Sequence, residues 1–212
     1  MYNSLIISTY TRLTGRSFHY PGVPKEYPIV NKSTDVCWYP LRVTYSRELQ
    51  LKEVLDAEHI ENFIPMHYEY VKQGERKIRK LVPVVHNLVF VHSSFVCIDR
   101  IKRSLGSSLS VRYIIDRETN RPLIVPDSQM RSFIAVSGNY DEQIVYLDPA
   151  LTSLRKGDRV RIVGGVFEGV EGVVIRVKGD RRVSVCIKGI MAVATAYIHP
   201  SLIELIPDTI CD

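Results

Sequence analysis

The chain has 212 residues, of which 45% are hydrophobic and 24% charged, and its formal net charge is +5 at pH 7. This composition is typical of a globular protein with room for one large domain or two small ones. It contains no apolar run near the roughly 20 residues that a membrane helix needs. The apolar stretch at Leu5–Ile7 has no charged region before it, so we expect no signal peptide and predict a cytoplasmic protein.

Catalytic and metal-binding patterns are missing from the sequence. The four cysteines show no CxxC spacing, the six histidines form no HExxH pair, and no GxSxG motif is present. We therefore predict that the protein is not an enzyme and holds no metal or cofactor.

The elements of residues 37–137 alternate between strand and helix. The leader, residues 1–36, is rich in glycine and proline, and we expect it to be disordered. A strand in CWYPLRVTY precedes a helix with Leu51, Val54 and Leu55 at helical spacing. Then NFIPMHYEYV and LVPVVHNLVFVH read as two strands of a hairpin around the polar tip KQGERKIRK.

A second helix, two short strands and a third helix complete this region. Ser93 or Ser94 is the predicted N-cap of the second helix, and Gly106 ends it. The order βαββαβ plus a helix predicts an α+β fold with the ferredoxin-like split βαβ arrangement. Residues 138–150 are acidic and contain Gly138 and Pro149, so we interpret them as a linker.

Residues 151–206 have a different character. The stretch KGDRVRIVGGVFEGVEGVV places glycines among β-branched residues but offers neither the lysine nor the helix of a phosphate-binding loop. Glycines in short strands are typical of the turns, bulges and corners of a small barrel. We predict an SH3-like β-barrel followed by a tail at 207–212. The glycines oppose a helical alternative, because each costs roughly 1 kcal/mol in a helix.

Both regions resemble one known family. GDRVRIVGGVFEGVEGVV is similar to the KOW motif, whose spaced turn glycines correspond to Gly165, Gly169 and Gly172. CWYPLRVTYSRE, FIPM and VPVVHNLVFVH resemble, in order and spacing, the N-terminal domain of the NusG transcription elongation factors. HNL stands where the housekeeping members have Pro-Gly-Tyr, which is more similar to the UpxY-type antiterminators of capsular polysaccharide loci.

The resemblance implies a function without catalysis. A monomeric NusG-like factor would bind the clamp helices of RNA polymerase, contact DNA or nascent RNA in the elongation complex, and promote antitermination in specific long operons. In some relatives the barrel contacts ribosomal protein S10 or the termination factor Rho, and the sequence leaves this open. The alternative is an RNA-binding or ribosome-associated KOW module, because Lys178, Arg181 and Arg182 line a turn of the barrel.

An apolar sheet face is the predicted polymerase-binding surface. The first and third strands are apolar on both faces, so one face needs a partner if the helices cover only the other. That second set is Trp38, Pro40, Leu88 and Phe90. The alternative is that the linker, the barrel or the third helix covers these residues.

Basic residues form the second candidate surface. Those on the hairpin and in the second helix are predicted to contact nucleic acid or the polymerase gate loop: Lys72, Arg76, Lys77, Arg79, Lys80, Arg100 and Lys102. The alternative is that they are ordinary solvated charges. In some specialised paralogues the C-terminal domain is a helical hairpin that hides the polymerase-binding face, whereas this sequence predicts a β-domain.

Overall fold

The structure is a computed structural model that describes residues 35–74, 76–139, 143–147, 157–187 and 189–207. Most of the predicted leader and tail, parts of the predicted linker and the first residues of the predicted barrel lie outside the described residues. No helix within the described ranges is long and apolar enough to cross a membrane.

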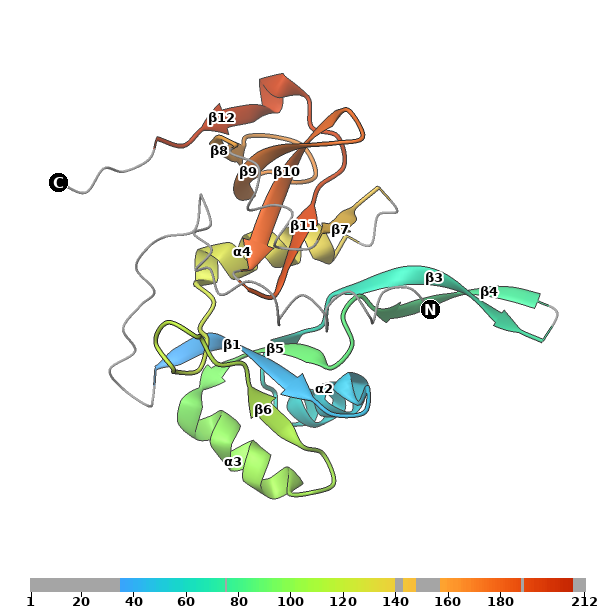
Figure 1. The fold of residues 1–212 in the computed structure, drawn as a ribbon, viewed down its shortest axis with the longest axis vertical. Helices are drawn as coiled ribbons and strands as arrows, with labels where there is room; N and C mark the ends of the chain where they lie inside the picture. The colour runs from blue at the N-terminus through green and yellow to red at the C-terminus, as the bar shows by residue number, and fades with distance from the viewer. Residues whose placement is uncertain (1–34, 75, 140–142, 148–156, 188, 208–212) are drawn as a thin grey trace.

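The N-terminal region is an α+β unit, as predicted. Its elements are β1 (Val36–Val43), α2 (Glu48–Ala57), β2 (Asn62–Phe63), β3 (Met66–Gln73), β4 (Arg76–Pro83), β5 (Leu88–Ser94), α3 (Phe95–Leu105), β6 (Val111–Tyr113) and α4 (Asp127–Ser137). Four strands form an antiparallel sheet in the order β2-β5-β1-β6, while β3 and β4 form a separate two-stranded ribbon. Helices α2 and α3 cover one face of the sheet and α4 the other (Figure 1).

The predicted two-faced pattern of the central strands is confirmed. Strands β1 and β5 pair antiparallel, with Tyr39 opposite Val91 and Pro40 opposite Phe90. Because side chains alternate along a strand, the two pairs point to opposite faces. Tyr39 and Val91 pack in one apolar cluster with α2 and α3, whereas Phe90 packs in a second cluster with α4.

The apolar segment after the hairpin tip is two strands and not one. Strand β4 ends at Pro83, which has no N–H for a ladder hydrogen bond, and β5 begins at Leu88. Between them Asn87 adopts φ +65°, a left-handed conformation that asparagine tolerates. Its carbonyl accepts a hydrogen bond from Val43 N–H at 3.1 Å. This turn brings the chain from the projecting ribbon back into the sheet.

The caps of α3 agree with the sequence. Ser94 Oγ accepts a hydrogen bond from Cys97 N–H at 3.3 Å, and Gly106 ends the helix with φ +55°. The side chains of Ile98 and Ile101 are buried against the sheet. The serine and the glycine therefore determine where this helix starts and stops, and its apolar side holds it in place.

The C-terminal region is a β-unit, as the glycine-rich sequence predicts. Its elements are β7 (Val145–Leu147), β8 (Arg159–Ile162), β9 (Glu171–Val177), β10 (Asp180–Ile187), β11 (Met191–Ala194), η2 (Pro200–Leu202) and β12 (Ile203–Leu205). The sheet order is β12-β8-β9-β10-β11-β7. Strand β7 lies in the predicted linker, yet Tyr146 pairs with Val193. Residues 145–147 therefore extend this sheet. We use barrel only as a short name for the β-unit from β7 to β12, and its SH3-like architecture stays a prediction.

Tyr113 gives the fold a dependence on alkaline pH. Its ring stacks on Phe95 with centroids 5.1 Å apart and meets Tyr39 edge-on at 5.7 Å. Burial raises the pKa of Tyr113, with smaller contributions from the charges of Asp99 and Tyr39. The folded chain thus keeps a proton that the unfolded chain releases near pH 10. This contribution to stability is complete below about pH 10 and is lost as the pH rises further.

We therefore expect Tyr113→Phe to flatten the loss of stability above about pH 10, since phenylalanine has no proton to release. Urea midpoints measured at intervals from neutral to strongly alkaline pH, for the variant and the parent chain, will check this. Equal alkaline slopes for the two proteins would contradict the assignment to Tyr113.

Candidate functional site

The predicted polymerase-binding face is inside the molecule. Phe90 is fully buried, and Leu88 and Trp38 keep only 2% and 4% of their surface exposed. Pro40 is also buried. The prediction that this face is exposed is therefore wrong. The third helix and the barrel cover it, which is the alternative that the sequence left open. Their role in binding RNA polymerase stays a prediction.

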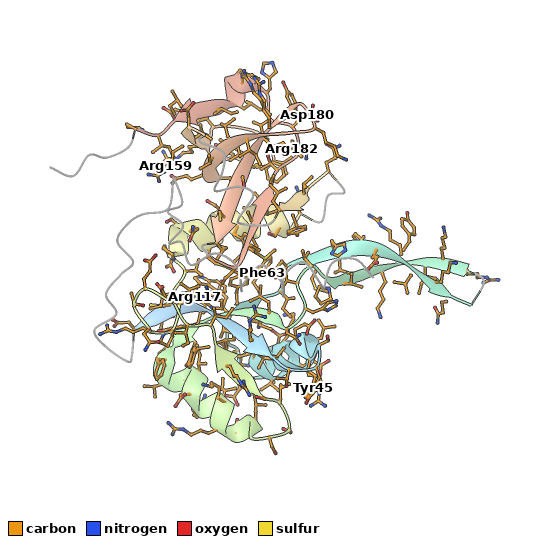
Figure 2. All side chains as sticks on the ribbon, in the orientation of Figure 1. Tyr45, Phe63, Arg117, Arg159, Asp180 and Arg182 are labelled. Atoms are coloured by element: carbon orange, nitrogen blue, oxygen red, sulfur yellow. The ribbon has the colours of Figure 1, made fainter. Side chains whose placement is uncertain are left out.

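Helix α4 lies between the sheet and the barrel (Figure 1). Its side chains Met130, Phe133 and Val136 are fully buried. The ring of Phe133 lies 5.7 Å from that of Phe90 on β5 and 6.2 Å from that of Phe63 on β2. The same apolar cluster continues into the barrel through valines and isoleucines of β8, β9, β10 and β11. One core thus spans both regions, and Figure 2 shows the side chains that fill the space around Phe63.

Directional hydrogen bonds fix the barrel on α4. Gln129 Nε2 donates to the carbonyl of Cys186 at 2.6 Å, and Ser132 Oγ accepts from Glu171 N–H at 3.2 Å. From β7, the Tyr146 hydroxyl donates to the carbonyl of Met66 at 3.3 Å. These bonds specify one orientation, whereas apolar burial alone is not directional.

The start of α4 meets a histidine on the sheet. His92 stacks on Trp38 with ring centroids 4.8 Å apart and an interplanar angle of 13°. Its Nδ1 lies 2.6 Å from Glu61 Oε2, and its Nε2 lies 3.9 Å from Asp127 Oδ1. Asp127 is the first residue of α4. His92 therefore connects the Trp38 ring on the sheet with the carboxylate of Asp127 at the start of α4.

The hairpin of β3 and β4 is mostly exposed. Strands β3 and β4 extend away from the sheet and the barrel (Figure 1), and their side chains stand off both faces of the ribbon (Figure 2). All five predicted basic residues of the hairpin are exposed: Lys72, Arg76, Lys77, Arg79 and Lys80. The register distributes them over both faces, with Lys72 opposite Lys77 and Lys80 opposite Glu69. The sequence grouped these residues, but only the ribbon geometry separates them.

The predicted cations of α3 are engaged within the chain. Arg100 donates to Glu58 Oε2 at 3.0 Å, and the two side chains are 65% and 48% exposed. Lys102 Nζ lies 3.6 Å from Asp99 Oδ1 and 4.3 Å from the centre of the Tyr113 ring. Because α3 covers the face of the sheet opposite α4, these cations belong to a different surface from the predicted polymerase-binding face.

The three glycines that the sequence suggests as KOW turn glycines have conformational roles. Gly165 and Gly169 both adopt φ +83°, a backbone conformation that side chains disfavour. Gly172 is required for another reason, because a Cβ there would lie 2.4 Å from the carbonyl oxygen of Ser184. Gly165 and Gly169 thus allow turns, and Gly172 allows strands β9 and β10 to approach closely.

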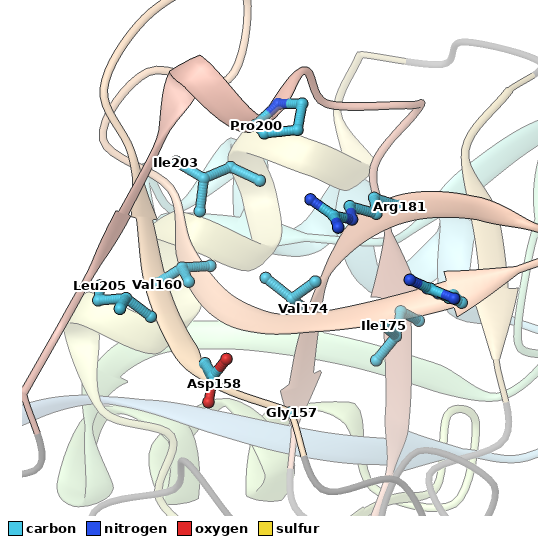
Figure 3. Close-up of a pocket in the computed structure, with 10 residues that line it drawn as sticks. Gly157, Asp158, Val160, Val174, Ile175, Arg181, Pro200, Ile203 and Leu205 are labelled. Carbon is cyan, nitrogen blue, oxygen red and sulfur yellow. The ribbon is translucent and has the colours of Figure 1, made fainter.

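A groove of about 680 Å³ opens on the barrel (Figure 3). Its apolar floor includes Val160 and Ile203, and its lining includes Arg176 and Arg181, which are directly opposite each other in the β9–β10 register. Arg182 instead faces the protein, where it donates to the carbonyls of Gln143 and Thr195. Of the three cations that suggested an RNA-binding turn, Arg182 therefore has a structural role.

Within the described ranges no three His, Cys, Asp or Glu side chains are placed to hold a metal ion. The three cysteines of those ranges, Cys37, Cys97 and Cys186, form no disulfide with one another. Burial raises the pKa of the Cys37 thiol, with further contributions from the carboxylates of Asp127 and Asp35, which makes the thiolate less available.

Residues 36–134 match the family described as transcription termination factor nusG. The match begins at β1 and ends within α4, so it covers the sheet, the ribbon and most of the helix that carries the barrel. Comparison with curated proteins finds no match. The barrel lies outside the match.

Proposed function

Because residues 36–134 match the NusG family, we propose that the protein is a transcription elongation factor that binds RNA polymerase without catalysing a reaction. The observation that carries this proposal is the coincidence of the match with a sheet whose second face holds the buried apolar side chains of Trp38, Leu88 and Phe90. The family resemblance supplies the partner surface, the clamp helices of the polymerase. We further infer a ferredoxin-like sheet and an SH3-like KOW barrel.

The binding surface is the sheet face that contains Trp38, Pro40, Leu88 and Phe90, together with α4. In the described structure the barrel occupies the far side of α4 and shares its core with this face. Polymerase helices of apolar character would therefore compete with the barrel for α4, and they would reach Phe90 only if α4 also moved away from the sheet. In the packed state the barrel lies on α4 and polymerase cannot bind there. The more stable this contact is, the weaker the apparent affinity for polymerase becomes.

The hairpin and α3 are the proposed contacts outside the polymerase-binding face. Hairpin cations would meet the phosphates of DNA or nascent RNA, an interaction that does not depend on sequence and weakens with salt. Arg100 and Lys102 would reach the gate loop only by exchanging their present ion pairs with Glu58 and Asp99. Antitermination of specific long operons, such as capsular polysaccharide loci in the UpxY manner, is the finer functional proposal.

Weakening the contact between α4 and the barrel is expected to tighten polymerase binding. Gln129→Ala with Ser132→Ala removes the hydrogen bonds to Cys186 and Glu171. At about 1 kcal/mol each, their loss is expected to increase affinity by up to about 30-fold if the packed state predominates. Titration of the full-length chain against core RNA polymerase measures this effect.

Arg131→Ala is the matched control, because Arg131 is exposed on the same helix. Its affinity for the polymerase should equal that of the parent chain. An unchanged or weaker affinity for the Gln129/Ser132 double variant would show that the barrel does not compete with polymerase. Absence of polymerase binding by every form of the chain would overturn the proposed function itself.

A second candidate function is an RNA-binding or ribosome-associated barrel, and the groove in Figure 3 favours it. Arg176 and Arg181 place two guanidinium groups beside an apolar floor. In the NusG-like function this groove is the surface available to ribosomal protein S10 or Rho. Co-purification of ribosomes without polymerase would favour the second candidate.

A further inference from the structure

The two faces of the β3–β4 ribbon differ in chemistry. In the register Tyr68 is opposite Leu81, Tyr70 is opposite Arg79, and Lys72 is opposite Lys77. Because directly paired residues point to the same side of a ribbon and alternate residues share a side, these six lie together. We call them the tyrosine face. The other face carries the pairs Glu69 with Lys80, Val71 with Ile78, and Gln73 with Arg76.

The tyrosine face concentrates positive charge. It has three cations and no carboxylate or amide side chain, whereas on the other face Lys80 is directly opposite Glu69 in the register. Lys72 and Lys77 are directly opposite, an arrangement that destabilises a ribbon by charge repulsion. An anionic ligand beside the two lysines would offset this repulsion.

The tyrosine face also exposes aromatic rings. Tyr70 is 66% exposed and Tyr68 is 42% exposed, on a ribbon that extends away from both cores (Figure 1). The Arg79 guanidinium lies 3.9 Å from the centre of the Tyr68 ring. Tyr68 and Tyr70 are two residues apart and hence about 6.8 Å apart along the strand. The two tyrosine rings and the cationic side chains of this face thus lie within a short length of the ribbon.

We propose that the tyrosine face binds single-stranded nucleic acid. A base stacks on Tyr70, and the flanking phosphates pair with Lys72, Lys77 and Arg79. Exposed aromatic rings within a basic groove or strip are the chemistry that holds single strands without sequence preference. In a duplex the base faces are stacked inside, so the tyrosines would have nothing to stack on. Base stacking and phosphate pairing do not involve the 2′-hydroxyl, so we expect DNA and RNA to bind equally.

This inference rests on the proposed contact between the hairpin and nucleic acid, but its test does not require polymerase. Fluorescence anisotropy of the full-length chain is measured with labelled dT20, U20 and a 20-base-pair duplex at several salt concentrations. We expect dT20 and U20 to bind equally well and more tightly than the duplex. Tyr70→Ala should weaken binding of both single strands by about 5-fold to 150-fold, while Tyr70→Phe stays within about twofold because the ring remains.

Two charge variants with equal loss of charge separate the faces. Lys77→Gln with Arg79→Gln changes the tyrosine face, and Arg76→Gln with Lys80→Gln changes the other face. The first pair should reduce the salt slope by about 1.4, and the second pair by clearly less. Circular dichroism confirms that each variant is folded.

Four outcomes would overturn the proposal: tighter binding of the duplex, undiminished binding by folded Tyr70→Ala, equal effects of the two charge pairs, or no binding of dT20 and U20. Each leaves the proposed function intact if the chain still binds polymerase. Conversely, single-strand binding by a chain that does not bind polymerase would retain this inference and reject the proposed function.

Discussion

Phe133→Ala is expected to destabilise the sheet and the barrel together, by about 4 kcal/mol. Phe133 is fully buried on α4 and contacts the rings of Phe90 and Phe63. It belongs to the cluster that continues into the barrel, so its removal leaves a cavity in a core that both regions share. The parent chain should accordingly unfold in one cooperative step.

Two probes of unfolding check this result. Trp38, the single tryptophan, reports on the sheet by fluorescence, while far-ultraviolet circular dichroism reports on the whole chain. The two urea transitions should coincide in the parent chain and shift together in Phe133→Ala. Phe95→Ala is the control, because Phe95 is half-buried on the opposite face, and we expect a smaller loss. A Trp38 transition that does not move in Phe133→Ala would show that α4 is not part of the core of the sheet.

Gly172→Ala is expected to destabilise the barrel by about 3 kcal/mol. The new Cβ would lie 2.4 Å from the Ser184 carbonyl oxygen and 2.8 Å from Val183 Cγ1, both on the neighbouring strand β10. A backbone atom cannot move aside without breaking the β9–β10 pairing. Amide hydrogen exchange should therefore show lost protection in β9 and β10.

Gly169→Ala separates the two roles of glycine in this motif. A Cβ at Gly169 meets nothing within 4 Å, and only its φ of +83° opposes a side chain. Its cost should be about 1 kcal/mol, which is smaller than that of Gly172→Ala. If the two variants were equally stable, the close approach of β9 to β10 would not be the reason for glycine at position 172.

Local patterns in the sequence predicted much of the fold. Alternation in CWYPLRVTY and LVFVH determined which residues of β1 and β5 share a face, since the side-chain direction of a strand has a period of two. Ser94 and Gly106 predicted the ends of α3 through capping and left-handed geometry. The glycines of the C-terminal region predicted strands in place of helix, because each glycine destabilises a helix whatever its neighbours in the folded structure are.

The candidate site was less predictable because its surroundings come from distant parts of the chain. The alternation of β5 predicted the face on which Phe90 lies. Nothing near Phe90 in the sequence predicted that Phe133 and barrel residues such as Val185 would cover it. Tyr146 in the predicted linker became part of a barrel strand because β11 offered an edge to pair with. On the hairpin, composition identified the cations, and only the pairing register assigned Lys77 and Lys80 to opposite faces.

The sequence by itself therefore determined the conformation of most segments and the apolar sides of β1 and β5, although not the break between β4 and β5 or the strand at 145–147. Only the tertiary structure decided what covers the face with Leu88 and Phe90, and that cover governs whether a partner can reach them. The reason is physical: backbone preferences and side-chain periodicity act over a few residues. Burial of apolar surface is non-directional, so the neighbour that provides it is selected by shape and by a few hydrogen bonds across the assembled core.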